Sequence, residues 1–419
     1  MRLTRLLLSD YRNFPSLDLR LSPGPSIFVG DNAQGKTNLL EAIYLLSAMR
    51  TPRVQTESQL IRWQALSSGG QTSGLPDSSL ISPSSPNGTY GVARAVGELE
   101  TLRGSLSVEV TVMSREGNNG RLLSGKTVRI NGLPRRLIDA VGRVNAVLFT
   151  ADDLDLVKGP PALRRRYLDL TISQVDAAYL GARQRYEKIL LQRNHLLKRI
   201  RERQAGPEEL AFWDQELAKE GAYIIWARAR ATAALAKLAS AAHALLAPDE
   251  ELCLQYQPRL PSEEELSPLD QSDPSAVSEA FLRAQRQQFA HEVAAGMTLV
   301  GPHRDDIIFL LNGIPAIASA SRAQQRTMAL ALRLAEARYL LANSGESPIL
   351  LLDDVLSEMD AHRRRCVLEA LTDYEQVLIT ATDLDRFSTD FFGRAALYEV
   401  VAGSIIPKGQ LTSVKKEDA

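Results

Sequence analysis

Residues Gly30–Thr37 read GDNAQGKT, which fits the phosphate-loop pattern of Gly, any four residues and then Gly-Lys-Thr. Glycines let backbone N–H groups surround phosphate oxygens. Lys36 can then reach the β- and γ-phosphates, and the Thr37 hydroxyl can bind Mg²⁺. The pattern predicts a site for a nucleotide and Mg²⁺. Its cofactor-binding residues are Gly30, Asp31, Asn32, Ala33, Gln34, Gly35, Lys36 and Thr37.

The segments on either side of this loop favour a nucleotide site over an ordinary glycine-rich turn. A short apolar run at 26–29 predicts a strand leading into the loop, and a run with helical spacing at 38–46 predicts a helix leaving it. An anion binds well where a strand and a glycine loop lead to a helix N-terminus, because free N–H groups point at it.

A second motif, PILLLDD at Pro348–Asp354, is an apolar run that ends in two carboxylates. Such a run suits a strand buried on both faces of a sheet, and ligands of open α/β sheets bind at the carboxyl ends of the strands. We expect Asp353 to hold Mg²⁺ together with Thr37, directly or through water. Asp354 is expected to orient or deprotonate the attacking water, with Lys36 as the other catalytic residue. Two helix-capping acids after a core strand are the alternative.

A third element lies at Ser321–Arg326, which reads SRAQQR and opens an amphipathic helix reaching Leu341. Ser321 occupies an N-cap position. In dimeric ATPases of the ABC type, such a helix N-terminus faces the γ-phosphate held by the other subunit. Ser321 and Gln324 are therefore further candidates for nucleotide binding, although an ordinary N-cap serine gives the same pattern.

Composition is that of an ordinary soluble globular protein. The 419 residues are 44% hydrophobic and 24% charged, with a net charge of −1. Two distant cysteines, Cys253 and Cys366, exclude a disulfide scaffold and suit a reducing compartment. The chain has no uncharged apolar run of membrane-spanning length, and the apolar core near Met1 is too short for a signal peptide. We expect a cytoplasmic protein with no membrane contact.

The pattern along the chain predicts an α/β head with a mixed sheet, interrupted by an inserted helical arm. Alternating or continuous apolar runs predict strands at 3–8, 17–21, 106–112, 126–130, 307–311 and 349–352. Asn-Gly pairs after two of these runs predict hairpin turns. The predicted domains are the N-terminal part of the head at 1–158, the helical arm at 159–297 and the C-terminal part of the head at 298–419. Within the first, the Ser/Gly/Pro-rich stretch 67–89 is expected to be a disordered insertion.

A strongly basic helix is predicted at 182–203. Cations on a helix suit phosphates and give affinity without reading base sequence. A solvated charged face is the alternative. The candidate DNA contacts are Arg183, Arg185, Lys188, Arg193, Lys198, Arg199 and Arg203.

Several long segments are similar to the RecF family, bacterial recombination mediators related to SMC-type repair ATPases. The similar segments are YRNF at 11–14, VGDNAQGKTNLLEAIYLL at 29–46, DDLDLVKGPPALRRRYLDL at 152–170, YEKILLQRNHLLK at 186–198, TLVGPHRDD at 298–306, AQQRTMALALRLAEARYLL at 323–341 and PILLLDDVLSEMD at 348–360.

This resemblance implies that the nucleotide is ATP, bound by an ABC-type P-loop ATPase head with a helical arm in place of a long coiled coil. It also implies an ATP-dependent homodimer that binds single-stranded and double-stranded DNA at junctions and gaps, with weak DNA-stimulated ATP hydrolysis as a switch. With the RecO and RecR proteins, the family promotes RecA loading in DNA repair, replication restart and the SOS response. Residues 321–326 would then form the signature motif, and 357–360 would form the loop that crosses the dimer interface.

Three departures from the family pattern stand out. Ala323 occupies a signature position that usually carries Gly, Ala151 replaces a common Pro, and the stretch 67–89 looks inserted. Neither Thr380 nor Thr382 is the His found at the corresponding switch of transporter-type ABC proteins. Because glycine allows closer approach to a phosphate and unusual φ values, Ala323 predicts slow hydrolysis that Ala323→Gly would speed up. Alternatively, Ala323 lies in a helical conformation that alanine stabilises.

Two other functional classes compete with this interpretation. A metabolic P-loop kinase or a GTPase would need an acceptor site or a guanine-specific NKxD segment, which the sequence lacks. The ATPase subunit of a membrane transporter would carry its signature much nearer the phosphate loop. Here the candidate signature at 321–326 follows Thr37 only after a long helical segment.

Overall fold

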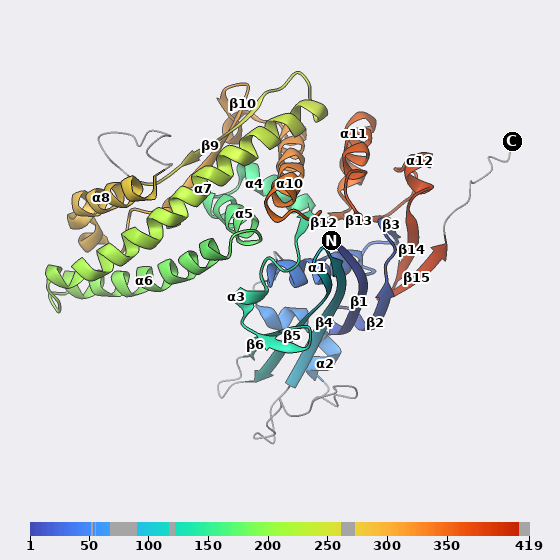
Figure 1. Ribbon diagram of the computed structural model, residues 1–419, viewed down its shortest axis with the longest axis horizontal. Helices are drawn as coiled ribbons and strands as arrows, with labels where there is room; N and C mark the ends of the chain where they lie inside the picture. Colours follow the sequence, from blue (N-terminus) through green and yellow to red (C-terminus); the bar gives the residue numbers. More distant parts are fainter. Residues whose placement is uncertain (52, 55, 68–89, 117–121, 261–272, 410–419) are drawn as a thin grey trace. The chain divides into compact units, whose positions relative to one another are not determined.

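The computed structural model describes residues 1–51, 53–54, 56–67, 90–116, 122–260 and 273–409. The chain forms two compact units (Figure 1). Unit 1 combines Met1–Ala151 with Gly345–Ala419, and unit 2 is Asp152–Ser344. Each unit is described below by itself.

A mixed six-stranded sheet carries the candidate nucleotide site in unit 1, with the strand order β15-β14-β3-β13-β12-β8. All neighbouring strands are parallel except β15, which pairs antiparallel with β14. The central strands β12 and β13 are mostly apolar and buried on both faces, as the run at 349–352 predicts. The strands are β3 Gly24–Val29, β8 Ala146–Phe149, β12 Ile349–Asp353, β13 Gln376–Ala381, β14 Ala396–Val401 and β15 Ser404–Gly409.

A second, antiparallel sheet of unit 1 has the order β2-β1-β4-β5-β6-β7. Its strands alternate between buried apolar residues and exposed polar ones, since one face packs inward and the other meets solvent. The predicted hairpin at Asn131-Gly132 is confirmed, with φ values of 50° and 77° that match a two-residue turn. The strands are β1 Arg2–Tyr11, β2 Phe14–Arg20, β4 Tyr90–Thr101, β5 Gly104–Glu116, β6 Leu122–Ile130 and β7 Leu133–Arg135.

Helix α1, Lys36–Ala48, contacts strands of both sheets in unit 1. It touches β8, β12 and β13 of the mixed sheet and β4 and β5 of the antiparallel sheet. A helix covered on both sides needs a largely apolar surface, and every residue from Leu39 to Ala48 is buried, with Glu41 as the one charged side chain among them. The shorter helices of unit 1 are η1 Glu57–Leu60, α2 Trp63–Ser67, α3 Leu137–Ala140, η7 Val355–Glu358, α11 Ala361–Leu371 and α12 Thr389–Phe392.

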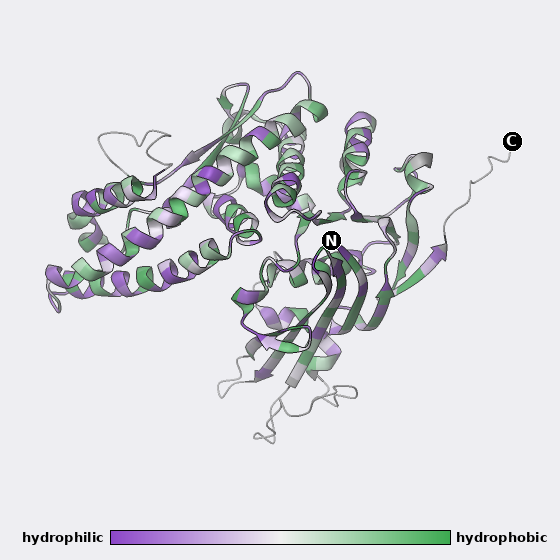
Figure 2. Ribbon diagram, in the orientation of Figure 1, coloured by the Kyte–Doolittle hydropathy of each residue, from purple (hydrophilic) through white to green (hydrophobic). Residues whose placement is uncertain are grey.

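Unit 2 is built around the long helix α7, Leu210–Leu246, which contacts α5, α6, α8, α10 and β9. In Figure 2, hydrophilic and hydrophobic residues alternate along α6 and α7, as expected for helices with one packed and one solvated face. The other helices are η3 Ala151–Asp153, α4 Leu154–Lys158, α5 Pro161–Ser173, α6 Ala177–Arg201, η4 Pro207–Glu209, α8 Pro274–Ala295, η6 Pro302–Arg304, α9 Ala316–Ser319 and α10 Arg322–Ser344.

A small antiparallel sheet, β11-β10-β9, completes unit 2. Its strands are β9 Leu252–Gln257, β10 Asp306–Leu311 and β11 Ile314–Pro315. The predicted turn at Asn312-Gly313 is confirmed, with φ values of 52° and 76°.

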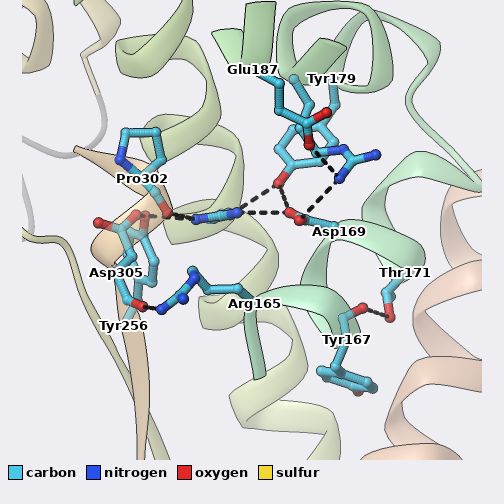
Figure 3. Close-up of polar contacts among 11 residues, drawn as sticks. Arg165, Tyr167, Asp169, Thr171, Tyr179, Glu187, Tyr256, Pro302 and Asp305 are labelled. Atoms are coloured by element: carbon cyan, nitrogen blue, oxygen red, sulfur yellow. Dashed lines mark hydrogen bonds and ion pairs between the residues drawn. The ribbon is translucent and has the colours of Figure 1, made fainter. Parts of the chain in front are cut away.

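Asp169, Tyr179 and Pro302, which Figure 3 labels, all contact one buried arginine of unit 2. Arg228, on α7, donates hydrogen bonds to the Asp169 carboxylate (2.8 Å), the Tyr179 hydroxyl (3.0 Å) and the Pro302 carbonyl oxygen (2.6 Å). Its Nη1 also lies 3.3 Å from Oδ2 of Asp305. Burial raises the pKa of Asp169, but the charges of Arg228 and Arg183, together with the hydrogen bonds from Tyr179 and Arg228, outweigh this effect and keep the pKa below its ordinary value. A buried charge is tolerated here because its donors are satisfied.

Neighbouring side chains extend this polar cluster. Tyr256 donates a hydrogen bond to Asp305, and Arg165 donates one to the Asp305 carbonyl oxygen (2.7 Å; Figure 3). Beside it, His303 shares a hydrogen bond with the Tyr186 hydroxyl (2.7 Å). Burial lowers the pKa of His303 to about 4, so this imidazole is neutral at physiological pH.

The compact units divide the chain at other residues than the predicted domains. The predicted head ends at residue 158 and resumes at residue 298, whereas unit 1 ends at Ala151 and resumes at Gly345. The difference arises because α10 packs on α7 and α4, which places 298–344 with the helical unit. That head and arm act as separate functional domains stays a prediction. The predicted disordered insertion at 67–89 lies outside the described residues apart from Ser67, the last residue of α2.

The α/β class, with a mixed sheet and a long helical region, is confirmed. Within the described residues, every helix is too short or too polar to span a lipid bilayer.

Candidate nucleotide-binding site

The phosphate loop connects β3 to α1, as the sequence predicts. Gly35 is the N-cap of α1 and has a φ of 113°, a conformation that strongly favours glycine. A Cβ atom on Gly35 would lie 2.3 Å from Nδ2 of Asn13, and one on Gly30 would lie 2.4 Å from the Val400 carbonyl oxygen. Close packing against the Val400 backbone therefore requires a glycine at position 30, and the positive φ favours one at position 35.

Two turns brace the back of the phosphate loop at Gln34. The Asn13 side-chain amide and the Gly403 backbone N–H donate to the Gln34 carbonyl oxygen, at 2.9 Å and 3.1 Å. The Ala402 N–H donates to Oε1 of Gln34 at 2.6 Å. Asn13 also accepts a hydrogen bond from the Asn38 side chain (2.8 Å) in the first turn of α1. The loop is thus held by the β1–β2 turn and the β14–β15 turn.

The YRNF segment contributes a second anchor. Arg12, whose φ is 53°, donates hydrogen bonds from Nε and Nη2 to the two carboxylate oxygens of Glu41, both at 2.9 Å. Glu41 is buried on α1. The sequence alone predicts no role for these side chains, because their partners lie outside the segment.

Lys36 lies with its ammonium group inside the loop. Its Nζ donates to the carbonyl oxygens of Gly30 (2.5 Å) and Asp31 (2.9 Å). Burial lowers the pKa of Lys36, and the nearby carboxylates of Asp354 and Asp353 oppose this effect. The ammonium therefore occupies the part of the loop in which a phosphate would need a cation.

Thr37 and Asp353 meet at the carboxyl end of the mixed sheet. The Thr37 hydroxyl donates to Oδ1 of Asp353 at 2.8 Å, although 316 positions separate them in the chain. A hydroxyl and a carboxylate are the kind of oxygen ligands that Mg²⁺ takes from proteins, with water and nucleotide phosphates supplying the rest. The described residues contain no group of three or more His, Cys, Asp or Glu that could hold a metal by itself. The pair therefore fits Mg²⁺ shared with a nucleotide, and does not form a separate protein cage.

Asp354 follows β12 in a left-handed conformation, with φ 52° and ψ 25°. Its backbone N–H donates to Oγ1 of Thr380 on β13 (3.0 Å). A left-handed conformation is uncommon outside glycine, although aspartate tolerates it better than most residues. The candidate catalytic carboxylate thus stands on a backbone conformation that its neighbours must hold.

Ser321 and Gln324 form a capping box at the start of α10, within unit 2. The Ser321 N–H donates to Oε1 of Gln324 (2.8 Å), and the Gln324 N–H donates to the Ser321 hydroxyl (3.3 Å). The predicted N-cap role of Ser321 is confirmed. The Gln324 amide also donates to Glu250 (2.9 Å). Any contact of either residue with a nucleotide stays a prediction.

Ala323 lies in the first turn of α10, and its φ is not among the positive values of the described chain. Its carbonyl oxygen accepts a hydrogen bond from the Thr327 hydroxyl (2.9 Å). The expectation that this position needs the conformational freedom of glycine is therefore wrong. The backbone is helical there, and alanine is the residue that stabilises a helix most.

The predicted basic helix 182–203 corresponds to the part of α6 that ends at Arg201 and to the two residues after it. Its cations have different environments. Arg193 is wrongly predicted as a DNA contact, because its side chain is 1% exposed and pairs with Asp214 and Glu292. Arg185 forms a bidentate ion pair with Glu220 (2.7 and 2.9 Å).

The remaining candidate cations of α6 differ in exposure. Arg183 donates to Glu187 at 2.9 Å, and Arg199 donates to the carbonyl oxygen of Gln204 at 3.1 Å. The exposed members of the predicted set, besides the paired Arg185, are Lys188, Lys198 and Arg203. We refer to these three as the exposed basic face.

Comparison with known proteins places this site in context. Residues 2–390 match the sequence profile of the RecF/RecN/SMC N-terminal domain. The DNA replication and repair protein RecF of Chloroflexus aurantiacus is 42% identical over 97% of this chain and 99% of its own length. The protein of the same name from Halalkalibacterium halodurans is 35% identical, over 98% of this chain and 100% of its own length.

Solved structures agree with these relatives. A structure described as the recombination mediator protein RecF with ATP, in the RecFOR pathway, superposes with a TM-score of 0.79. It is 28% identical and covers 97% of each chain. A second structure of that mediator, described as RecF-ATPrS, superposes with a TM-score of 0.77 at 28% identity.

Proposed function

This chain belongs to the RecF family of SMC-like ABC ATPases, a family of DNA replication and repair proteins, and from that premise we propose an ATP-dependent recombination mediator. The observation that carries the proposal is the hydrogen bond from the Thr37 hydroxyl to Oδ1 of Asp353 (2.8 Å), together with the Lys36 ammonium inside the same loop. These groups have the chemistry that a triphosphate and its metal require.

ATP would lie with its phosphates in the loop 30–37, where backbone N–H groups and Lys36 provide positive charge. Mg²⁺, held by Thr37 and Asp353 with the phosphates, would neutralise charge on the β- and γ-oxygens. Asp354 would orient a water or accept its proton during slow hydrolysis. Hydrolysis would then serve to reset a binding switch.

The switch that we propose is a homodimer closed by ATP. The N-terminus of α10 carries the positive end of a helix dipole, so it attracts a γ-phosphate. In the dimer, Ser321 and Gln324 would contact the nucleotide held by the partner subunit. Only the triphosphate would bridge both subunits, so ATP would favour the closed state and ADP the open state.

DNA binding would use the exposed basic face of α6. Lys188, Lys198 and Arg203 are solvent-exposed cations on one helix and the turn after it. Phosphate contacts of this kind recognise single-stranded or double-stranded DNA at gaps without reading sequence. With RecO and RecR as partners, the protein would promote RecA loading in DNA repair, replication restart and the SOS response, in the bacterial cytoplasm.

Light scattering with ATP, with ADP and without nucleotide tests the switch. The apparent mass should double with ATP alone. Ser321→Arg should keep nucleotide binding and lose the dimer, whereas Lys36→Ala should lose both. Equal dimer in all three nucleotide states would contradict the proposed switch.

Steady-state ATP hydrolysis tests the link to DNA. Gapped DNA should stimulate turnover more than fully duplex DNA of the same length, and Asp354→Asn should remove the stimulated turnover while nucleotide binding persists. Turnover that ignores all DNA would refute the DNA-linked part of the proposal.

A further inference from the structure

A single buried hydroxyl connects the two acidic residues of the nucleotide site. Thr380 lies on β13, directly paired with Asp353 in the parallel register of β12 and β13, and is 1% exposed. Its Oγ1 lies 2.9 Å from Oδ1 of Asp353 and 3.3 Å from the carbonyl oxygen of Leu352. The same oxygen accepts the backbone N–H of Asp354 at 3.0 Å.

The proton balance of this hydroxyl decides what it does. A threonine hydroxyl has one proton to donate and lone pairs to accept with. The Thr380 oxygen accepts the Asp354 N–H. Its own proton goes to Oδ1 of Asp353, which is charged and lies nearer than the Leu352 carbonyl oxygen, since hydrogen bonds to ionised groups are stronger. Thr380 therefore donates to one acidic residue and accepts from the backbone of the next.

The two contacts fix different properties of the site. Oδ1 of Asp353 accepts from both Thr37 and Thr380, which holds the carboxylate in one orientation. The contact to the Asp354 N–H stabilises the left-handed backbone from which that side chain projects. Strained backbone at a functional site persists only where its surroundings determine it strongly.

We infer that Thr380 is a positioning residue for both Asp353 and Asp354. This inference rests on the proposed function, because it presupposes that Asp353 meets Mg²⁺ with a nucleotide. Groups that orient a metal-binding side chain typically change metal affinity or activity by about 10–100-fold when they are removed. A threonine that served only the packing of β13 would affect stability and leave the metal response unchanged.

The experiment uses the full chain with Thr380→Val, which keeps the shape and removes both hydrogen bonds, and Thr380→Ser, which keeps the hydroxyl. A fluorescent ATP analogue is titrated in excess Mg²⁺ and in EDTA. For Thr380→Val we expect the gain in nucleotide affinity from Mg²⁺ to fall about tenfold, with affinity in EDTA unchanged. Thr380→Ser should behave like the unaltered protein.

Thr232→Val is the matched control, because Thr232 is equally buried, lies in unit 2, and its hydroxyl has no hydrogen-bond partner among the described residues. It should leave the Mg²⁺ response unchanged. Thr380→Ala provides a second hydroxyl-free variant if the valine variant does not fold, with folding checked by circular dichroism.

The outcomes separate the two proposals. If the unaltered protein binds no nucleotide in Mg²⁺, the proposed function fails. If it binds with a clear Mg²⁺ response that the valine and alanine variants share, the inference about Thr380 is overturned while the proposed function stands. A Thr380→Ser variant as impaired as Thr380→Val would also overturn it, because packing and not the hydroxyl would then matter.

Discussion

Arg193 and Glu292 form an ion pair in which both side chains are buried. Nη2 of Arg193 lies 2.7 Å from Oε2 of Glu292, and the two side chains are 1% and 0% exposed, respectively. The arginine also donates to Asp214 and to the Thr298 hydroxyl. It therefore joins α6 to α7, to α8 and to the segment that follows α8. Removing one partner of such a pair leaves an uncompensated buried charge, which is the costly case.

For Arg193→Ala we accordingly expect a loss of about 3–5 kcal/mol in the free energy of unfolding. Urea unfolding followed by circular dichroism measures it. Arg203→Ala, at an exposed site, should change stability by less than about 0.5 kcal/mol. Similar small effects for both variants would mean that the pair contributes little.

DNA affinity should depend on the exposed basic face and not on Arg193. Changing Lys188, Lys198 and Arg203 together to Glu should weaken binding by a similar factor on any base sequence. It should also flatten the dependence of log K on log salt by about 0.9 per lost phosphate contact. Fluorescence anisotropy at several salt concentrations measures both. As a control of opposite sign, Gln192→Lys adds a cation at an exposed position of α6 and should tighten binding. An unchanged salt slope in the triple variant would identify the face as merely solvated.

Lys36→Ala should abolish ATP binding, since it removes the ammonium that lies within the phosphate loop. The fold should persist, because the braces at Gln34 do not involve this side chain. Titration with a fluorescent nucleotide gives the affinity, and thermal unfolding serves as the control. Unaltered affinity in a folded variant would refute the assignment of this loop.

The Ala323→Gly variant should hydrolyse ATP in the presence of DNA no faster than the unaltered protein. The family pattern leads to the opposite expectation, that glycine would speed up hydrolysis. The reason for expecting no acceleration is the helical backbone at this position, where glycine costs about 1 kcal/mol relative to alanine and loosens the first turn of α10. Steady-state hydrolysis with gapped DNA compares the two proteins, and nucleotide affinity is the control. Faster turnover in the glycine variant would show that the methyl group is a handicap after all.

Acid should destabilise unit 2 through His303. Its Nε2–H donates to the Thr298 carbonyl oxygen, so Nδ1 accepts from Tyr186 and protonation would disrupt that contact. Burial lowers the pKa of this imidazole to about 4, below the ordinary value of 6.5. Between these values the folded state binds fewer protons than the unfolded state, so stability falls as pH decreases. From pH 7 to pH 5 the contribution of His303 should fall by about 2 kcal/mol.

Urea unfolding at both pH values, on the unaltered protein and on His303→Gln, isolates this effect from that of other titrating groups. The glutamine variant should lose less stability between pH 7 and pH 5. Parallel losses in the two proteins would show that the histidine does not carry the pH dependence.

Local patterns predicted much of the fold and part of the site. The phosphate loop, the apolar run before Asp353 and the Asn-Gly turns depend on neighbours in sequence, so they could be predicted. Charge composition alone misassigns Arg193, because it does not say which cations of a helix face the core. Arg193 follows Tyr179 and Tyr186 at intervals of seven residues, and both tyrosines are buried on the same helix. That spacing was the available signal.

The contacts of Asn13 and Thr380 could not be predicted from local patterns. Each meets partners that the order of strands in a sheet brings together, and strand order is not encoded in the segment itself. A threonine or an asparagine at a strand end is commonplace, so its role appears only when the pairing of β12 with β13 and the turns behind Gln34 are known.

The braces of the phosphate loop have a consequence for how the protein is made. Gln34 is synthesised early, but its side chain is held by Ala402, 368 positions later, and Thr37 depends on Asp353. A chain still emerging from the ribosome carries the whole GDNAQGKT segment without the parts that shape it. Nucleotide binding should therefore arise only after Ala402 has left the ribosome, as a step that also waits for slow, long-range pairing of parallel strands.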